Sequence, residues 1–265
     1  QNMIDPVSSN PYTLGYNIYN VPQGQLLIGS NGKLNPNATL GNVVHYGGMD
    51  MMLRPDNWMD EVYNHGLRQE YNMNVSAGTD KSSFYASISY LDNEGITVNS
   101  DYERLTGRLK ADYQVKDWLK VGANMAYTHF NSNSLGEDGS SSSSGNVFAI
   151  ASYIAPIYPF YMRDGQGNIM TDSRGYKMYD WGSGFTEADQ NTYLLRPFLS
   201  NANAYASNML DENNAEGNAI TANGFAEIRF LKDFKFTWTS SVNLDETRQT
   251  AYTNPYYGQY ASQNG

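Results

Sequence analysis

The sequence has no cysteine, a low share of charged residues and no long apolar run. Without cysteine, the chain cannot form a disulfide scaffold, a thiolate metal site or a thiol nucleophile. Charged residues make up 17% of its 265 residues, against roughly 25% in soluble domains. A transmembrane helix needs about 18 consecutive apolar residues, and no such stretch is present. The polarity of the chain therefore comes mainly from asparagine, serine, threonine, glycine and tyrosine.

The charge balance and the positions of the histidines argue against several further classes of function. The chain carries 17 basic and 27 acidic residues, a net charge of −10, and has no basic cluster of the kind that neutralises phosphates. Its histidines, His45, His65 and His129, are far apart and lack the spacing of a zinc site. Nucleophile-elbow, phosphate-loop and dinucleotide-binding motifs are missing too. We therefore expect no nucleic-acid binding, no enzyme activity, no cofactor and no metal site.

Six segments alternate strictly between apolar and polar residues, which is the pattern of a β-strand with two different faces. They are 9 to 13 residues long and lie at residues 70–78, 83–91, 104–115, 118–130, 219–231 and 234–245. Strands of soluble proteins usually have about 5–6 residues, whereas a strand that crosses a membrane needs about 9–11. Tight connections at residues 79–82, 116–117 and 232–233 alternate with long ones. This alternation is typical of barrels with short periplasmic turns and long extracellular loops.

The sequence thus predicts an all-β fold that is a portion of a transmembrane antiparallel β-barrel. Six strands cannot close such a barrel, since single-chain barrels begin at about eight, and no export signal is visible. We expect a piece of a longer protein. A secreted or cell-surface all-β glycan-binding or adhesin module is the alternative, and a barrel enzyme of the outer membrane is a third class. In a barrel, the alternation predicts lipid-facing Val75, Ile88, Leu109, Val121, Ile228 and Trp238, and lumen-facing Arg104, Arg108, Lys110, Glu227 and Arg229.

Several motifs in sequence order resemble one family. They are NWMDEVY at residues 57–63, GLRQEYN at 66–72, SAGTDKSSFY at 76–85, YLDNEGI at 90–96 and WLKVGAN at 118–124. Together they resemble the start of the barrel in SusC-like (SusC/RagA family) TonB-dependent outer-membrane transporters of the Bacteroidetes type. The resemblance covers most of the chain, from about residue 11 to 250.

The resemblance implies about six strands, the second to seventh, of a 22-stranded plugged barrel, with the plug and the remaining barrel absent from this chain. It also implies active import of an oligosaccharide or glycan, or of a peptide, across the bacterial outer membrane. The partners would be a SusD-like surface lipoprotein, the outer-membrane lipids and the TonB complex, which would act through the absent N-terminal part.

Family topology divides the chain into five parts. Residues 1–69 would be an extracellular loop with a short helix near 57–63, residues 70–130 four transmembrane strands, and 131–218 a long extracellular loop. Residues 219–247 would form two more transmembrane strands, and 248–265 the start of the next extracellular loop.

The long loop carries aromatic side chains among charged ones, a composition that suits a sugar or a peptide. Packing of the loop on itself is the other interpretation of these aromatics. We also expect residues 164–168 to form a turn, since the alternating carboxylates of a calcium loop are missing. The candidate substrate contacts are Tyr158, Tyr161, Arg163, Tyr176, Tyr179 and Trp181.

Overall fold

The computed structural model describes residues 3–4, 11–12, 18–46, 48–134, 147–186, 192–195 and 203–254. The chain divides into two compact units. The first, here called the strand unit, consists of Asn64–Leu135 and Glu212–Tyr252. The second, here called the loop unit, consists of Gln1–Tyr63, Gly136–Asp211 and Thr253–Gly265.

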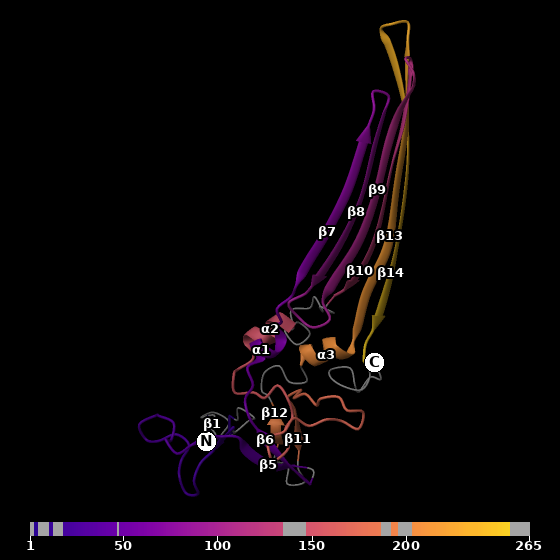
Figure 1. The fold of residues 1–265 in the computed structure, drawn as a ribbon. Helices are drawn as coiled ribbons and strands as arrows, with labels where there is room; N and C mark the ends of the chain where they lie inside the picture. The colour runs from indigo at the N-terminus through magenta and orange to yellow at the C-terminus, as the bar shows by residue number, and fades with distance from the viewer. Residues whose placement is uncertain are drawn as a thin grey trace. The chain divides into compact units, whose positions relative to one another are not determined.

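The strand unit is one antiparallel sheet of six long strands (Figure 1). Neighbours along the chain are neighbours in the sheet, in the order β14-β13-β10-β9-β8-β7. The predicted six-stranded antiparallel arrangement is therefore confirmed. The strands are β7 (Arg68–Gly78), β8 (Ser82–Glu94), β9 (Asp101–Lys116), β10 (Leu119–Asn133), β13 (Glu212–Phe230) and β14 (Phe234–Tyr252).

The strands run further than the alternating segments of the sequence. β13 begins at Glu212 rather than at residue 219, β14 continues to Tyr252 rather than 245, and β10 reaches Asn133. Residues 131–133 and 212–218 therefore belong to strands, not to the long loop as the sequence predicted. The reason is that both faces become polar near these ends, so the apolar alternation stops while the backbone pairing continues. One such pair is Glu216 with Arg248.

The register of the sheet places the apolar positions of all six strands in common rows and the polar positions in others. Because residues directly opposite each other in adjacent strands point to the same face, the pairing defines an apolar face and a polar face. A row of the apolar face consists of Val75, Ala86, Leu109, Met125, Ala222 and Val242. The neighbouring row of the polar face consists of Asn74, Ser87, Arg108, Ala126, Thr221 and Asn243.

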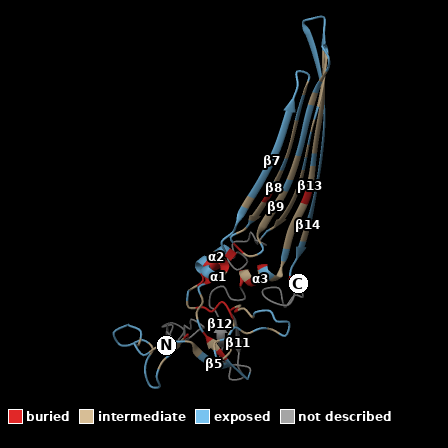
Figure 2. Ribbon diagram, viewed as in Figure 1, coloured by how far each residue is buried: buried red, intermediate tan, exposed pale blue. Residues whose placement is uncertain are grey.

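The apolar face of the sheet is not covered in the strand unit. Met73 is 73% exposed, and Val75, Trp238 and Leu244 are exposed as well. Figure 2 shows the same for the edge strands β7 and β14, which are coloured as exposed along nearly their whole length. An exposed apolar face of this extent is typical of a surface that contacts a membrane or another protein.

The loop unit is built from short elements. Its helices are α1 (Trp58–Val62), α2 (Val147–Tyr153) and α3 (Ala204–Leu210). No helix of the described residues is both long and apolar enough to cross a membrane. The short strands pair as β1 (Met3–Ile4) with β2 (Pro11–Tyr12), β3 (Tyr19–Asn20) with β4 (Thr39–Leu40), β5 (Asn42–Tyr46) with β6 (Met49–Leu53), and β11 (Ser183–Thr186) with β12 (Thr192–Leu195).

Candidate ligand-binding site

An aromatic cluster forms the centre of the loop unit. Phe160 is fully buried, and four rings pack against it edge-on. The ring centroids of Trp58, Tyr161, Tyr205 and Tyr179 lie 4.8, 4.9, 5.2 and 5.8 Å from that of Phe160. Edge-to-face pairs of this kind add about 0.5–1.5 kcal/mol each beyond the burial of their surface. The cluster thus joins α1, α3 and the segment around residue 160.

Polar groups fix the aromatic cluster in place. The Trp58 indole donates a hydrogen bond to the Tyr158 carbonyl at 3.0 Å. Asn203 is fully buried and is the N-cap of α3, where its side-chain oxygen accepts from the Ala206 amide. The side-chain nitrogen of Asn203 also donates to the carbonyls of Phe160 and Asp180. One asparagine therefore both starts the helix and ties it to the cluster.

A pair of turns follows the cluster along the chain. Asp164 and Asp172 each accept the backbone amides two and four residues later through the same side-chain oxygen, Oδ1. Gly167 and Gly175 occupy equivalent places in the two turns, with φ of +90° and +87°, a region that favours glycine. The side chain and backbone of Asn168 hold the pKa of Asp164 below its usual value. Residues 164–168 thus form the expected turn.

The turns arrange three backbone segments in a closed ring. The Met162 amide donates to the Met178 carbonyl, the Met178 amide to the Met170 carbonyl, and the Met170 amide to the Met162 carbonyl, at 2.9, 2.9 and 3.0 Å. Because each segment is held by the other two, their side chains are positioned without a long strand or helix.

A cavity of about 350 Å³ lies between these turns and α3. Four aromatic and four aliphatic side chains dominate its lining. Tyr176 is exposed, and Tyr179, Trp181 and Tyr205 are half-buried. The lining consists of Met162, Gly175, Tyr176, Lys177, Met178, Tyr179, Trp181, Tyr205, Met209 and Leu210.

Three tyrosines at or beside this cavity, Tyr161, Tyr179 and Tyr205, stay neutral at physiological pH. Burial raises the pKa of Tyr179 to about 12, and burial also raises the pKa of Tyr205. Burial, followed by the hydrogen bond that its hydroxyl donates to Glu61 at 2.6 Å, raises the pKa of Tyr161. Among the described wall residues the charged one is Lys177, whose Nζ lies 5.0 Å from the centre of the Tyr161 ring, and the Arg174 guanidinium lies 5.8 Å from the centre of the Tyr176 ring.

The six candidate contacts separate into two groups. Tyr176, Tyr179 and Trp181 line the cavity. Tyr158 and Tyr161 are buried in the packing of the loop unit, 4% and 5% exposed. Arg163 forms a two-pronged ion pair with Asp56, and both side chains are nearly buried. For these three, packing of the loop on itself is the better interpretation, because Tyr158 and Tyr161 are buried and Arg163 is paired with Asp56.

Sequence reasoning missed several cavity residues. Met162 and Met178 belong to an eight-residue repeat, Met-x-Asp, at residues 162–164, 170–172 and 178–180. This repeat could have predicted that Met162 and Met178 lie together, because its three methionines are the residues of the ring of backbone hydrogen bonds. Tyr205 and Met209 lie on α3, and no local pattern connects them to the turns.

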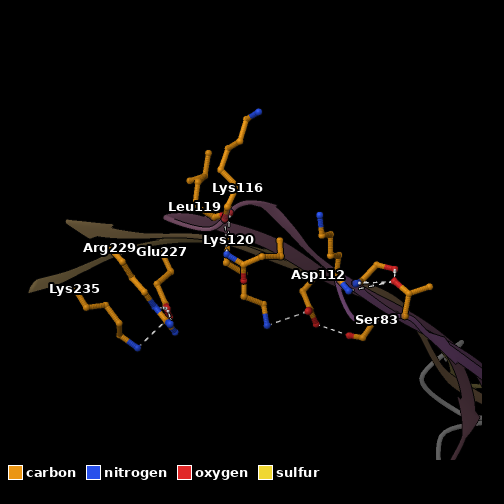
Figure 3. A network of polar contacts seen from close by, with 12 residues as sticks. Ser83, Asp112, Lys116, Leu119, Lys120, Glu227, Arg229 and Lys235 are labelled. Atoms are coloured by element: carbon orange, nitrogen blue, oxygen red, sulfur yellow. Dashed lines mark hydrogen bonds and ion pairs between the residues drawn. The ribbon is translucent and has the colours of Figure 1, made fainter. Parts of the chain in front are cut away.

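The polar face of the sheet carries a network of charges near the tight turns (Figure 3). Asp112 accepts a hydrogen bond from the Ser83 hydroxyl and pairs with Lys120 at 3.0 Å. Glu227 lies between Arg229 and Lys235, at 2.9 and 3.0 Å. These contacts connect neighbouring strands and compensate the carboxylates of this face.

The register places each predicted set of strand residues on one face. The six predicted lipid-facing residues share the apolar face, and the five predicted lumen-facing residues share the polar face. Which face meets lipid stays a prediction. Among the described residues, no group of three or more histidine, aspartate or glutamate side chains is placed to hold a metal ion.

Comparison with known proteins gives partial but consistent matches. No protein-family model matches the chain. TonB-dependent receptor P39 of Formosa agariphila is 32% identical over 97 residues, which are 37% of this chain and 9% of that protein. TonB-dependent receptor P3 of the same organism is 26% identical over 72% of this chain and 17% of its own length. TonB-dependent receptor SusC of Bacteroides thetaiotaomicron is 22% identical over 75% of this chain and 19% of its own length.

A solved structure shares the fold. The RagAB peptide importer in its closed-closed state superposes with a TM-score of 0.53 at 23% identity, covering 77% of this chain and 20% of that one. The six-stranded sheet is thus a part of a barrel of this kind. The chain spans about a fifth or less of the length of the proteins it matches.

Proposed function

We propose, since this chain is a portion of a SusC-like TonB-dependent receptor, that the whole protein actively imports a nutrient across the bacterial outer membrane. The nutrient would be an oligosaccharide or a peptide. The loop unit would lie outside the cell and contact the nutrient beneath a SusD-like surface lipoprotein. Energy would come from the TonB complex through a part of the protein upstream of this chain.

The amphipathic sheet is the single observation that carries this proposal. On β9 the apolar positions run from Leu105 to Val115, ten steps of about 3.4 Å along the strand. At the tilt of about 40° found in outer-membrane barrels, this corresponds to an apolar band of roughly 25 Å, the height that such barrels present to lipid. The apolar face would therefore meet lipid and the polar face the hydrated lumen.

The edges of the sheet support the same proposal. Among the described strands, β7 and β14 each pair with one neighbour only. An open edge in a membrane would leave backbone amides and carbonyls without partners, at a cost of several kcal/mol each. In the whole protein these two strands would pair with further strands of a closed barrel.

The soluble alternative fits the sheet less well. A secreted adhesin or glycan-binding sandwich packs the apolar face of one sheet against a second sheet. In the strand unit the corresponding side chains are exposed over all six strands, including Met73 and Leu244. A solvated sheet of this kind would aggregate.

Fractionation and uptake measurements in the native bacterium test this function. We expect the full-length protein in the outer-membrane fraction, released only by detergent. Cells should accumulate a fluorescent oligosaccharide mixture or a fluorescent peptide mixture, and deletion of the gene, or of TonB, should abolish that accumulation. A strain lacking an unrelated outer-membrane receptor is the control. Extraction without detergent, or uptake that persists without TonB, would contradict the proposal.

A further inference from the structure

We infer that the cavity of the loop unit binds a large apolar side chain of a peptide, preferably an aromatic one. The inference rests on the proposed import function, because it chooses between the two nutrient classes. Its basis is the chemistry of the wall, which is formed by Met162, Met178, Met209 and Leu210 together with aromatic rings.

The described wall offers a sugar few hydrogen-bonding side chains, namely three tyrosine hydroxyls, one indole N–H and one ammonium. Among the described wall residues are no aspartate, glutamate, asparagine or glutamine, and these side chains can each bond to several hydroxyl groups at once. A hydroxyl that enters without a partner loses its hydrogen bonds to water, which costs about 1–3 kcal/mol. An apolar side chain incurs no such cost and gains from its own burial.

Two carboxylates that neighbour the wall residues in sequence are directed into turns. Asp172 accepts the amides of Arg174 and Tyr176 at 2.9 Å each, and Asp180 accepts the amide of Gly182 at 2.6 Å. These acids therefore shape the backbone beside the cavity, and the Glu61 carboxylate accepts the hydrogen bond of the Tyr161 hydroxyl. Lys177 supplies a positive charge at the wall and Arg174 lies over the ring of the wall residue Tyr176, which suits a carboxylate near the bound side chain.

The size of the cavity matches one large side chain. A dry protein cavity of about 150 Å³ holds benzene, and this one has about 350 Å³, which leaves room for an indole or phenol group. Three of its wall residues are methionines, whose flexible and polarisable side chains adapt to ligands of different shape. We therefore expect tryptophan, tyrosine, phenylalanine and leucine side chains to be accepted in one site.

Hydrogen bonds within the loop unit hold the backbone that carries the walls. Met162 and Met178 are held by the closed ring of backbone hydrogen bonds, and the α3 wall by the buried Asn203. A preformed site spends little of its binding free energy on ordering side chains.

Binding to two matched peptides tests the inference. Calorimetry would use the full-length protein in detergent with the pentapeptides Ala-Ala-Trp-Ala-Ala and Ala-Ala-Ser-Ala-Ala, and with maltoheptaose as a sugar probe. We expect the tryptophan peptide to bind at least about tenfold more tightly than the serine peptide, because only its side chain gains from burial. Maltoheptaose should neither bind the cavity nor displace the tryptophan peptide.

Two variants locate the effect. Met209→Glu places a carboxylate at the cavity wall, and we expect it to abolish the preference for tryptophan. Met59→Glu is the matched control, since Met59 and Met209 are both on helices of the loop unit and are 45% and 43% exposed, but Met59 does not line the cavity. This variant should keep the preference.

Three results would overturn the inference: equal affinity for the two peptides, displacement of the tryptophan peptide by maltoheptaose, or an equal loss in both variants. The uptake experiment separates this failure from failure of the proposed function. TonB-dependent uptake without any tryptophan preference would refute the cavity assignment alone, whereas absence of uptake would refute the transport function.

Discussion

The carboxylate of Asp56 ties two distant segments of the loop unit together. It accepts hydrogen bonds from the amides of Phe160 and Tyr161, at 2.8 and 3.3 Å, and from both terminal nitrogens of Arg163. Either Asp56 or Asn57 could cap α1, since the side chains of both residue types accept amide hydrogen bonds at a helix N-terminus. In the structure Asn57 is the cap, which leaves Asp56 free to hold residues 160–163.

Removal of Asp56 should loosen the loop unit strongly. In Asp56→Leu, the nearly buried Arg163 guanidinium and two backbone amides lose their partner, and we expect local destabilisation of about 3–5 kcal/mol. Arg163→Met should cost less, because the two amides keep the carboxylate. Hydrogen exchange of the Phe160 and Tyr161 amides in the full-length protein measures the effect.

An exposed ion pair provides the control for that experiment. Arg68 and Glu70 are 2.6 Å apart, with the arginine side chain 57% exposed, so Arg68→Met should change stability by less than about 1 kcal/mol. Unchanged exchange at Phe160 and Tyr161 in Asp56→Leu would show that Asp56 does not hold this segment.

Strands β10 and β13 pack a ring over a glycine on the polar face. Gly122 is directly opposite Phe225, and a Cβ added at Gly122 would lie 2.3 Å from that ring. Phe130 and Gly217 form a second such pair with the order reversed. Aromatic side chains that cover cross-strand glycines help to fix strand register.

Substitution at Gly122 should disturb this pairing. We expect Gly122→Ala to destabilise the folded barrel by about 1–3 kcal/mol, because the Phe225 ring must move, and Phe225→Leu to relieve the loss in the double variant. The midpoint of thermal unfolding in detergent measures both.

Gly107 is the control for the glycine experiment. It lies on the apolar face of β9, where an added Cβ meets no atom within 4 Å, so Gly107→Ala should be neutral or slightly stabilising. Equal unfolding midpoints for the two alanine variants would contradict the assigned role of Phe225.

The two faces of the sheet require two different environments around the whole protein. Asn74 and Val75 are adjacent in β7 and point to opposite faces. Val75 lies in a row near the middle of the apolar band, where an arginine in contact with lipid costs about 2–4 kcal/mol. Asn74 lies on the polar face, where an arginine would be hydrated.

Arginine substitution at these two positions tests the orientation of the sheet in the membrane. We expect Val75→Arg to reduce assembly of the full-length protein in the outer membrane and Asn74→Arg to leave it near the wild-type level. The amount of heat-resistant folded protein in purified outer membranes is the measure. Equal assembly of both variants, or the reverse order, would refute the proposed topology.

Strand alternation allowed the sheet to be predicted from the sequence, whereas the candidate site could be predicted only in part. Period-two alternation alone predicts that Leu109 and Arg108 lie on opposite faces, and the same alternation occurs in every strand of the sheet. Trp181 and Tyr176 could be recognised as aromatic residues of a long loop, but so could Tyr158 and Tyr161, and composition does not distinguish a ring in a cavity wall from a ring in the packing.

The sequence alone determined the six strands and which of their residues share a face, because both depend on local alternation. It also determined the resemblance to the family, because that depends on motifs in a fixed order. Only the tertiary structure decided which aromatic rings form a cavity, because Met162, Tyr179 and Met209 meet through turns and a helix far apart in the chain. Contacts of that kind depend on how segments pack, which no local pattern records.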